Sequence, residues 1–235
     1  MIYDIATVIC GDSKPTWPEM KKDHARTCFI YNSENLKSPC QRYQDFLMES
    51  EAEVIVYIHS DLDIHDADWS DRLLALFENP NCVVAGFGGA TSLGHTDLYK
   101  KPYRIDNMAR GGYCSNQTDA EVHGARFTGE KRVAVLDAFL MAVRREWLVK
   151  IGGWPVEHIT FHGGDLWLGC MAARMNKEIH MVGVSCTHRG GGVSTKAEYR
   201  DAKWLQGGSR DSDHALPHQW LYNEFRDVLP IQVNQ

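Results

Sequence analysis

Six side chains able to bind a metal ion or move a proton fall within the ten residues HSDLDIHDAD, at positions 59–68. The segment directly follows the apolar run VIVYI. Crowded carboxylates repel one another unless water or a cation neutralises them, and oxygen ligands of this kind suit Mg²⁺ or Mn²⁺. We therefore expect Asp61 and Asp63 to bind a divalent cation. Asp66 and Asp68 are better suited to cap the helix that follows.

The elements around this segment are typical of a mostly parallel sheet covered by helices. Strands are expected over residues 3–10, 26–32, 53–58 and 82–87, and helices over residues 40–50 and 69–77. Ligands of open α/β sheets bind beyond the carboxyl ends of the strands, and the acidic segment follows the strand expected over 53–58. The position of the segment therefore supports a functional site.

The second half begins with a polar, glycine-punctuated stretch, residues 88–132, which we expect to be a long functional or mobile loop. Ordered structure is expected again over 133–143, helices over 145–151 and 165–176, and a strand over 178–186. A terminal helix is expected to begin near Pro217 and to carry Trp220, Leu221 and Phe225 on one face. No linker divides the chain.

The composition is typical of a folded chain in water. It has 235 residues, 43% of them hydrophobic, and a formal net charge of −6, which disfavours duplex DNA or an anionic membrane surface as the main partner. The seven cysteines form no CxxC pair, which favours reduced thiols. The first residues do not resemble a basic leader, and the apolar runs are too short to cross a bilayer, so we expect neither a targeting segment nor a membrane span. We expect a cytoplasmic protein without a nucleic-acid partner.

Three other kinds of site share features with the acidic segment. An EF-hand loop would need Gly and Glu where the sequence has Asp66 and Arg72. A haloacid-dehalogenase-type phosphatase resembles DLDIH, but it places its first Asp directly on the strand and needs a later Lys and acidic pair. A metallophosphoesterase resembles SDL, but no GNH segment follows. Neither phosphatase is supported by a second motif.

Four segments, in order along the chain, resemble those of GT-A-fold glycosyltransferases, especially family 2 members. VIVYIHSDLDIHDADW resembles their DxD region, where an apolar strand meets an acidic turn. LDAFLMAVRREWLVKIGGWP resembles the stretch that lines the acceptor side. FHGGDLWLGCMAARMNKEIHMVGV resembles the segment that contributes the base, and HRGGG resembles the segment whose His completes the metal site. The resemblance spans about residues 3–193.

The resemblance implies a single α/β domain over residues 1–235, with a GT-A (Rossmann-like), mixed, mostly parallel sheet flanked by helices. Its parts would be a nucleotide-sugar-binding half (1–87), a long loop (88–132), an acceptor and catalytic half (133–193), and a lid with the C-terminal helix (194–235). The implied activity is metal-dependent, inverting transfer of a sugar, a hexose by preference, from a nucleotide diphosphate sugar. The preferred donor is a UDP-sugar, and the acceptor is a hydroxyl of a glycan or small molecule.

The resemblance also implies the metal ligands. The cation, Mn²⁺ or Mg²⁺, would neutralise the departing diphosphate, and His188 would join the aspartates that hold it. Two registers of the motif stay open. If DLD is the motif, Asp61 contacts the ribose or sugar and Asp63 the metal. If HSD is the motif, His59 replaces the first acid and Asp61 becomes the ligand. His188 could also serve only as a hydrogen-bonding residue at a strand end.

The candidate base is Asp165, which would take the proton from the acceptor hydroxyl as that oxygen attacks. It follows two glycines and opens an apolar helical run, so it could equally be the N-cap of that helix. The family's usual acidic residue before this Asp is Gly164 here, and the usual later Asp is Trp167. The match to the base segment is therefore partial.

The remaining implied contacts are with the donor. A base and ribose pocket is expected at the ends of the first two strands. His59 and Asp61, which follow the strand expected over 53–58, would also contact the nucleotide sugar. The other residues of this pocket are Cys10, Gly11, Asp12, Asn32 and Glu34. The segment from Gly190 onward could close over the diphosphate as a lid or be a mobile surface loop. The expected diphosphate contacts are Arg189, Lys196 and Lys203.

A function of another class is a non-catalytic nucleotide-sugar- or glycan-binding domain of the same fold. A metal-dependent phosphatase is a weaker alternative. The presence together of Asp61, Asp63, Asp165 and His188 favours an enzyme.

Overall fold

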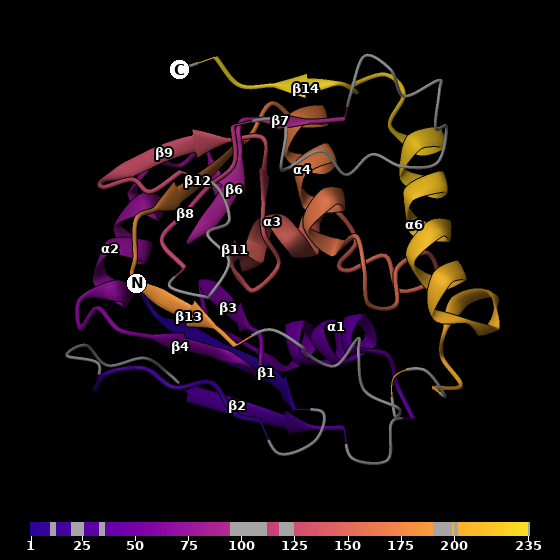
Figure 1. Ribbon diagram of the computed structural model, residues 1–235, viewed down its shortest axis with the longest axis horizontal. Helices are drawn as coiled ribbons and strands as arrows, with labels where there is room; N and C mark the ends of the chain where they lie inside the picture. Colours follow the sequence, from indigo (N-terminus) through magenta and orange to yellow (C-terminus); the bar gives the residue numbers. More distant parts are fainter. Residues whose placement is uncertain are drawn as a thin grey trace.

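A seven-stranded sheet forms the centre of the computed structural model, in the order β2-β1-β3-β11-β5-β12-β9 (Figure 1). The structure describes residues 1–9, 13–19, 26–32, 36–94, 112–117, 125–189, 199 and 202–234. The strands of this sheet are β1 (Tyr3–Ile9), β2 (Arg26–Tyr31), β3 (Val54–Ile58), β5 (Cys82–Gly86), β9 (Glu130–Val133), β11 (Leu140–Arg144) and β12 (Glu178–Val182).

The sheet is mixed, as expected. β1 pairs in parallel with β2 and β3, and β12 pairs in parallel with β5. β11 is antiparallel to both β3 and β5, so those two strands share one direction. β9 is antiparallel to β12. Most of the strands in the described part of this sheet therefore run the same way, and the expected GT-A-type α/β architecture is confirmed.

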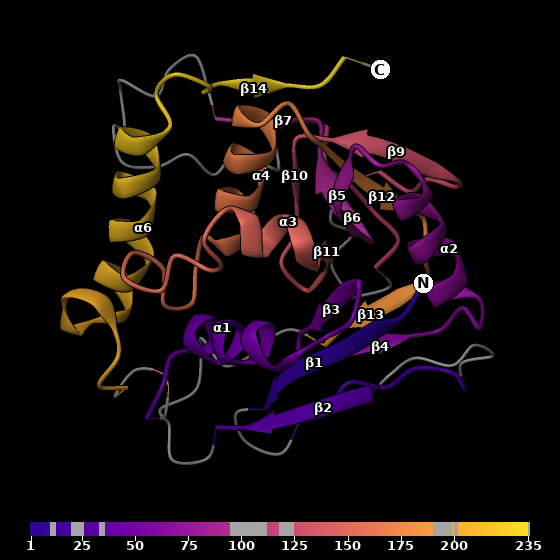
Figure 2. The same ribbon diagram turned by 180° about the vertical axis from the view of Figure 1, so that it is seen from behind.

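Alternate residues of the central strands feed two separate cores, because successive strand side chains point to opposite faces. In β3, Ile55 and Tyr57 belong to one core, and Val54, Val56 and Ile58 to the other. The first core is covered by α1 (Pro39–Glu49), α3 (Arg145–Lys150), α4 (Gly164–Arg174) and α6 (Arg210–Glu224). The second is covered by α2 (Trp69–Ala75). Figure 2 shows α2 on the opposite side of the sheet from the other helices.

Short strands form three smaller sheets within the described residues. β4 (Leu62–Ile64) pairs with β13 (Cys186–His188), and β7 (Ser92–Leu93) with β14 (Ile231–Gln232). β6 (Gly88–Ala90) lies between β8 (Cys114–Ser115) and β10 (Val135–Leu136). Residues 88–132 are therefore not one long loop, because their described parts contain β6, β7, β8 and part of β9. Strands of two to four residues leave almost no periodic signal, so the sequence did not indicate them.

The C-terminal helix begins earlier than the sequence indicated. Ser209 is the N-cap of α6, and its side chain accepts a hydrogen bond from the backbone N–H of Ser212. Pro217 consequently lies inside the helix rather than near its start. Proline removes one backbone hydrogen bond there, but its ring is buried and lies close to Gly163. Packing of this face therefore outweighs the local preference of proline for a helix start.

The described residues also form the one-turn 3₁₀ helices η1 (Leu76–Glu78) and η4 (Gln206–Gly208). Among the helices of the described residues, none combines the length and apolar character needed to cross a membrane.

Candidate metal and catalytic site

The β4–β13 ribbon brings the HRGGG segment beside the acidic segment. His188 is paired with Leu62, and the backbone N–H of Arg189 donates to the carbonyl oxygen of Asp61 at 2.9 Å. The two segments are more than a hundred residues apart in the sequence. Their antiparallel pairing places His188 next to the turn between β3 and β4, where Asp61 lies.

Three side chains converge at this point: His59, Asp61 and His188. One ligand atom from each lies within 4.8 Å of the others. His188 Nε2 is 3.2 Å from Asp61 Oδ1, and the ring centroids of His59 and His188 are 5.6 Å apart. The backbone N–H of His59 donates to the carbonyl oxygen of Phe139 at 2.9 Å, so the end of β3 is fixed to the start of β11. The cluster therefore sits at the carboxyl end of a central strand, where a site is expected.

The charges within the cluster favour its ligand-binding protonation states. Burial acts to raise the pKa of Asp61, but the hydrogen bond to His188 and the charges of both histidines outweigh it and hold that pKa below its ordinary value. Burial, and then the charge of His188, lower the pKa of His59. A metal ion requires an ionised carboxylate and neutral imidazoles as ligands. The cluster provides the ionised carboxylate and, at His59, the neutral imidazole.

The donor set fits a divalent cation. It combines one carboxylate with two imidazoles, and two His plus one carboxylate is a recurring arrangement that leaves further positions open for other ligands. Carboxylate oxygen suits Mg²⁺ and Mn²⁺, whereas imidazole suits transition metals. The two nitrogen donors therefore favour Mn²⁺ over Mg²⁺.

Asp63 lies outside this cluster. It is the middle residue of β4, and its Oδ1 accepts a hydrogen bond from the Thr16 hydroxyl at 2.6 Å. Its Oδ2 lies 3.4 Å from Arg189 Nε. The turn at Ser60 and Asp61 comes just before β4, so Asp61 and Asp63 do not follow the simple strand alternation that would place both on one face. The structure brings together the residues of the HSD register.

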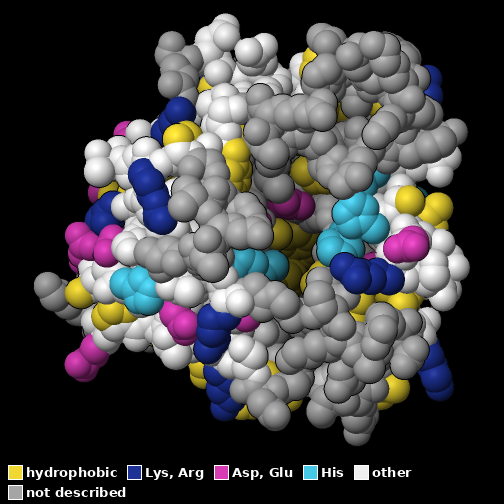
Figure 3. Space-filling view, viewed as in Figure 1, with side chains coloured by type: hydrophobic (Ala, Val, Ile, Leu, Met, Phe, Trp, Pro, Cys, Tyr) yellow, Lys and Arg dark blue, Asp and Glu magenta, His cyan; other side chains and the backbone are white. Residues whose placement is uncertain are grey.

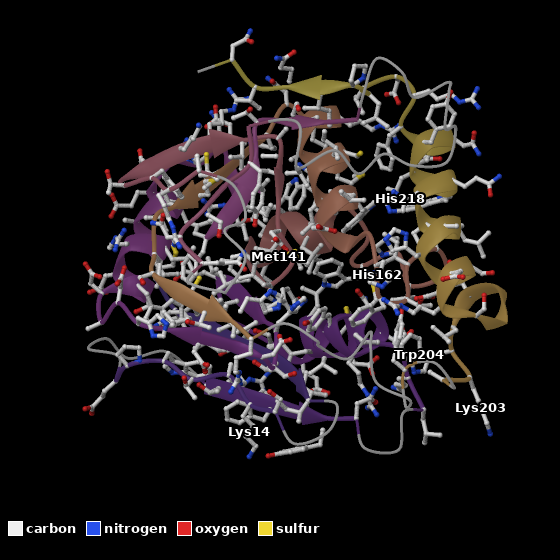
Figure 4. All side chains as sticks on the ribbon, in the orientation of Figure 1. Lys14, Met141, His162, Lys203, Trp204 and His218 are labelled. Atoms are coloured by element: carbon white, nitrogen blue, oxygen red, sulfur yellow. The ribbon has the colours of Figure 1, made fainter. Side chains whose placement is uncertain are left out.

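Arg189 holds the ribbon to the turn. Its guanidinium donates to the carbonyl oxygens of Lys14 and Ser60 at 2.6 and 3.1 Å, besides its ion pair with Asp63. These contacts occupy it with the protein's own oxygen atoms. Lys203, the other described residue of the expected diphosphate set, is exposed, and Figure 4 shows it at the outer edge of the molecule. Lys196 and most of the expected lid lie outside the described residues.

Asp165 lies in the first turn of α4 and is 9% exposed. Gly163 is the N-cap, with φ of 96°, a left-handed conformation that favours glycine. Asp165 is thus not the N-cap, the alternative role considered for it. A carboxylate in the first turn of a helix is stabilised by the helix dipole.

The expected nucleotide pocket is only partly described. Asn32 is buried, its amide nitrogen donates to the carbonyl oxygen of Lys37 at 2.8 Å, and its oxygen accepts from Arg42 at 3.0 Å. This side chain therefore fixes the connection between β2 and α1. The other four expected residues lie outside the described part of the chain: Cys10, Gly11, Asp12 and Glu34.

The caps expected from Asp66 and Asp68 are only partly formed. Asp68 occupies the N-cap position of α2, but its side chain makes no capping hydrogen bond. Asp66 instead accepts from the backbone N–H of Ser185 at 3.0 Å and pairs with Arg72 at 3.1 Å. Asp66 therefore ties the segment before α2 to the chain leading into β13.

Sequence reasoning missed Asp137, which lies between β10 and β11. Its Oδ2 accepts a hydrogen bond from the Tyr113 hydroxyl at 2.8 Å, and its charge acts on His59 to raise the pKa, against the larger effect of burial. In the sequence it is one acid within the run VAVLDAFLMAV, without any spacing that signals a site. The return of β11 beside β3 brings Asp137 near the cluster.

A second group missed from the sequence is made of His162, His214 and His218. Figure 3 shows a hollow near the centre of this face with histidine side chains on both sides of it. Figure 4, in the same orientation, labels His162 and His218 on the side of α6. Only the HxxxH spacing of residues 214 and 218 was visible in the sequence.

Comparisons with known proteins identify the family and the fold of the chain. A family model described as "Glycosyltransferase like family" matches residues 22–197, and no curated protein matches the chain. A crystal structure of GalNAc-T7 with UDP, GalNAc and Mn²⁺ aligns with 10% identity and a TM-score of 0.54, over 96% of this chain and 54% of that one. The chain thus spans about half the length of GalNAc-T7.

Another solved structure that resembles this chain is the mannosyltransferase PcManGT from Pyrobaculum calidifontis in complex with GDP-Man and Mn²⁺. Its identity is 11% and its TM-score 0.47, with coverage of 94% of this chain and 68% of that one. Because the family model spans most of the sequence, the chain belongs to this glycosyltransferase-like family.

Proposed function

We propose that this protein transfers a sugar from a nucleotide diphosphate sugar to a hydroxyl acceptor, with a divalent cation and with inversion at the anomeric carbon. The donor we favour is a UDP-hexose. The proposal rests chiefly on the convergence of His59, Asp61 and His188 at the sheet edge in a chain of a glycosyltransferase-like family.

These three residues would hold the cation, which we propose to be Mn²⁺. When bound, the ion would act as a Lewis acid that neutralises the departing diphosphate. Support comes from GalNAc-T7, a protein of similar fold whose structure contains UDP and Mn²⁺. Asp63 is proposed to position the turn through Thr16 and Arg189 rather than to bind the ion.

Asp165 is proposed as the general base. In a single in-line displacement, the acceptor oxygen forms a bond to the anomeric carbon while the bond to the diphosphate breaks. The acceptor proton moves to the Asp165 carboxylate. Because the acceptor attacks the anomeric carbon directly, no covalent enzyme intermediate forms. Its place in the first turn of α4 supports this role, because the helix dipole favours the ionised form that can accept a proton.

The test is a thermal-shift screen of nucleotide sugars and nucleoside diphosphates with and without Mn²⁺. Ligand binding to the folded state raises Tm as concentration exceeds Kd, so the true donor gives the largest Mn²⁺-dependent rise. Asp61→Asn should abolish the Mn²⁺-dependent part. Asp68→Asn is the matched control, because it makes the same change in the same segment at an exposed site. Equal Mn²⁺-dependent shifts in both variants would contradict the proposed ligand set.

A further inference from the structure

A row of three imidazoles lies outside the proposed metal set. His162 precedes α4, and His214 and His218 lie one turn apart on α6. The ring centroids of His162 and His214 are 4.9 Å apart, as are those of His214 and His218. His162 and His214 are half-buried, whereas His218 is 2% exposed and stacks on His214. A ligand can therefore reach the first two rings, and the third supports them.

The segments that carry the row are tied together by Asp213, whose side chain is fully buried. Its carboxylate accepts hydrogen bonds from the hydroxyls of Thr160 and Tyr199 and from the backbone N–H of Gln206. These bonds join α6 to the segment that carries His162. They also engage both oxygens of Asp213, so this acid, which directly precedes His214, already has protein partners.

The electrostatic surroundings of the row favour an anion. Burial, and then the positive charges of His214, Arg210 and His218, lower the pKa of His162 to about 3. The charge of His59 acts on the pKa of His162 in the same direction. The acid nearest to His162 in the sequence is Asp165, three residues further along the chain. Figure 3 shows histidine side chains and a basic side chain together beside the hollow. An anion bound there would offset the repulsion between protonated His162 and the positive charges of His214, Arg210 and His218.

The row is not arranged as a metal site. Among the described residues, the set of three ligand atoms within 4.8 Å of one another is that of His59, Asp61 and His188, and the row is not among such sets. The His162 and His214 rings are 4.9 Å apart and tilted, so each can donate one N–H to a different oxygen of one ligand. Two imidazoles and the Arg210 guanidinium offer more donors than the two oxygens of a carboxylate can use, and a phosphate group matches them better.

The position of the row assigns it to the acceptor. His162 is separated from the proposed base Asp165 only by Gly163 and Gly164, and the acceptor hydroxyl must lie at that base. The donor diphosphate would lie at the metal set. We propose that His162 and His214, with Arg210 beside them, bind a phosphate group of the acceptor, so that the acceptor is a phosphorylated hydroxyl compound. This proposal rests on the proposed function.

The first experiment needs neither donor nor metal. Inorganic phosphate is titrated into the full-length protein at constant ionic strength, and the histidine ring protons are followed by NMR. We expect the signals of His162 and His214 to move and the pKa of His162 to rise, because bound phosphate favours imidazolium. Variants His162→Asn and His214→Gln assign the signals. His158→Gln is the control, because His158 lies on the same segment but stacks on Trp220. Unmoved signals of His162 and His214 would overturn the proposal.

The second experiment uses the donor identified by thermal shift. A soluble sugar phosphate, a lipid phosphate that keeps a free hydroxyl, presented in detergent, and their unphosphorylated counterparts are compared as acceptors. We expect one of the phosphorylated acceptors to be preferred, and His162→Asn and His214→Gln each to lower its kcat/KM by about tenfold, the effect of one charged hydrogen bond. Activity should be unchanged in His158→Gln. Preference for an unphosphorylated acceptor overturns this proposal but not sugar transfer, whereas failure of every nucleotide sugar to bind with Mn²⁺ overturns the proposed function.

Discussion

At the level of single residues, a change at Asp165 gives the sharpest test, because the proposed base and the proposed metal ligands lie on different segments. Asp165→Asn keeps the shape of the side chain but removes its ability to accept a proton. We expect kcat to fall by about 10²- to 10⁴-fold. The Mn²⁺-dependent thermal shift with donor should persist, because the proposed metal ligands are unchanged in this variant.

The same substitution separates an enzyme from a binding domain of this fold. Sugar transfer and slow donor hydrolysis are measured for the parent protein and the variant. Retained turnover in Asp165→Asn would refute the base assignment. Donor binding by the parent protein without any turnover would favour a non-catalytic role.

At the scale of elements, the β4–β13 ribbon depends on Arg189. This side chain binds the carbonyl oxygens of Lys14 and Ser60 and pairs with Asp63. Arg189→Ala should destabilise the fold by about 1 kcal/mol, since partly exposed hydrogen bonds contribute modestly. It should also weaken Mn²⁺ binding, because His188 is its neighbour in the chain. Urea unfolding and calorimetric Mn²⁺ titration measure the two effects.

Lys203→Ala is the control for that prediction, because Lys203 is exposed and lies at the outer edge of the molecule. If Arg189 only contacted the donor diphosphate, its replacement by alanine would not change the stability of the ligand-free protein. An unchanged urea midpoint in Arg189→Ala would therefore argue against its structural role and return it to the diphosphate set.

The attachment of α6 depends on Asp213, the other element-scale contact that we expect to matter. Asp213→Asn replaces one acceptor oxygen with a donor, so one of the hydroxyl or N–H groups facing it loses its partner. We expect a loss of about 1 to 3 kcal/mol in unfolding free energy, as for a buried group left unsatisfied. Asp211→Asn, exposed on the same helix, should change it little. Equal urea midpoints for the two variants would contradict this account.

At the scale of the whole molecule, Trp154 joins elements from both halves of the chain. Its indole N–H donates to the Tyr57 hydroxyl of β3 at 3.2 Å, its backbone N–H donates to Gln44 of α1 at 2.8 Å, and its ring packs against Trp167 of α4. Trp154→Ala should cost about 3 to 5 kcal/mol, as for other large core truncations. Thermal and urea unfolding measure this loss.

Trp154 also lies against the turn that carries the proposed base. A Cβ on Gly164 would be 3.1 Å from its ring, so the start of α4 rests on this side chain. We therefore expect Trp154→Ala to lower kcat besides stability, and Trp154→Phe to retain most of both. Full activity in the alanine variant would show that the position of Asp165 does not depend on this core.

Long apolar runs and helical periodicity are local signals, and they were enough to predict the order of the main strands and helices. An acidic segment after a buried central strand and the resemblance to glycosyltransferases were also recognisable along the chain, and the family match confirms that resemblance. The short strands within residues 88–132 and the early start of α6 were not predicted, because tertiary pairing and packing override weak local preferences there.

Which side chains meet depends on how distant segments of the chain pack together. The turn before β4 sends Asp61 toward His59 and His188, whereas Asp63 faces Thr16 and Arg189. Both aspartates look alike in sequence, and the choice between them depends on the backbone path and on a ribbon formed with β13. The histidine row likewise needs α6 to pack beside the start of α4. Contacts between distant segments form through non-local packing, which spacing along the chain does not encode.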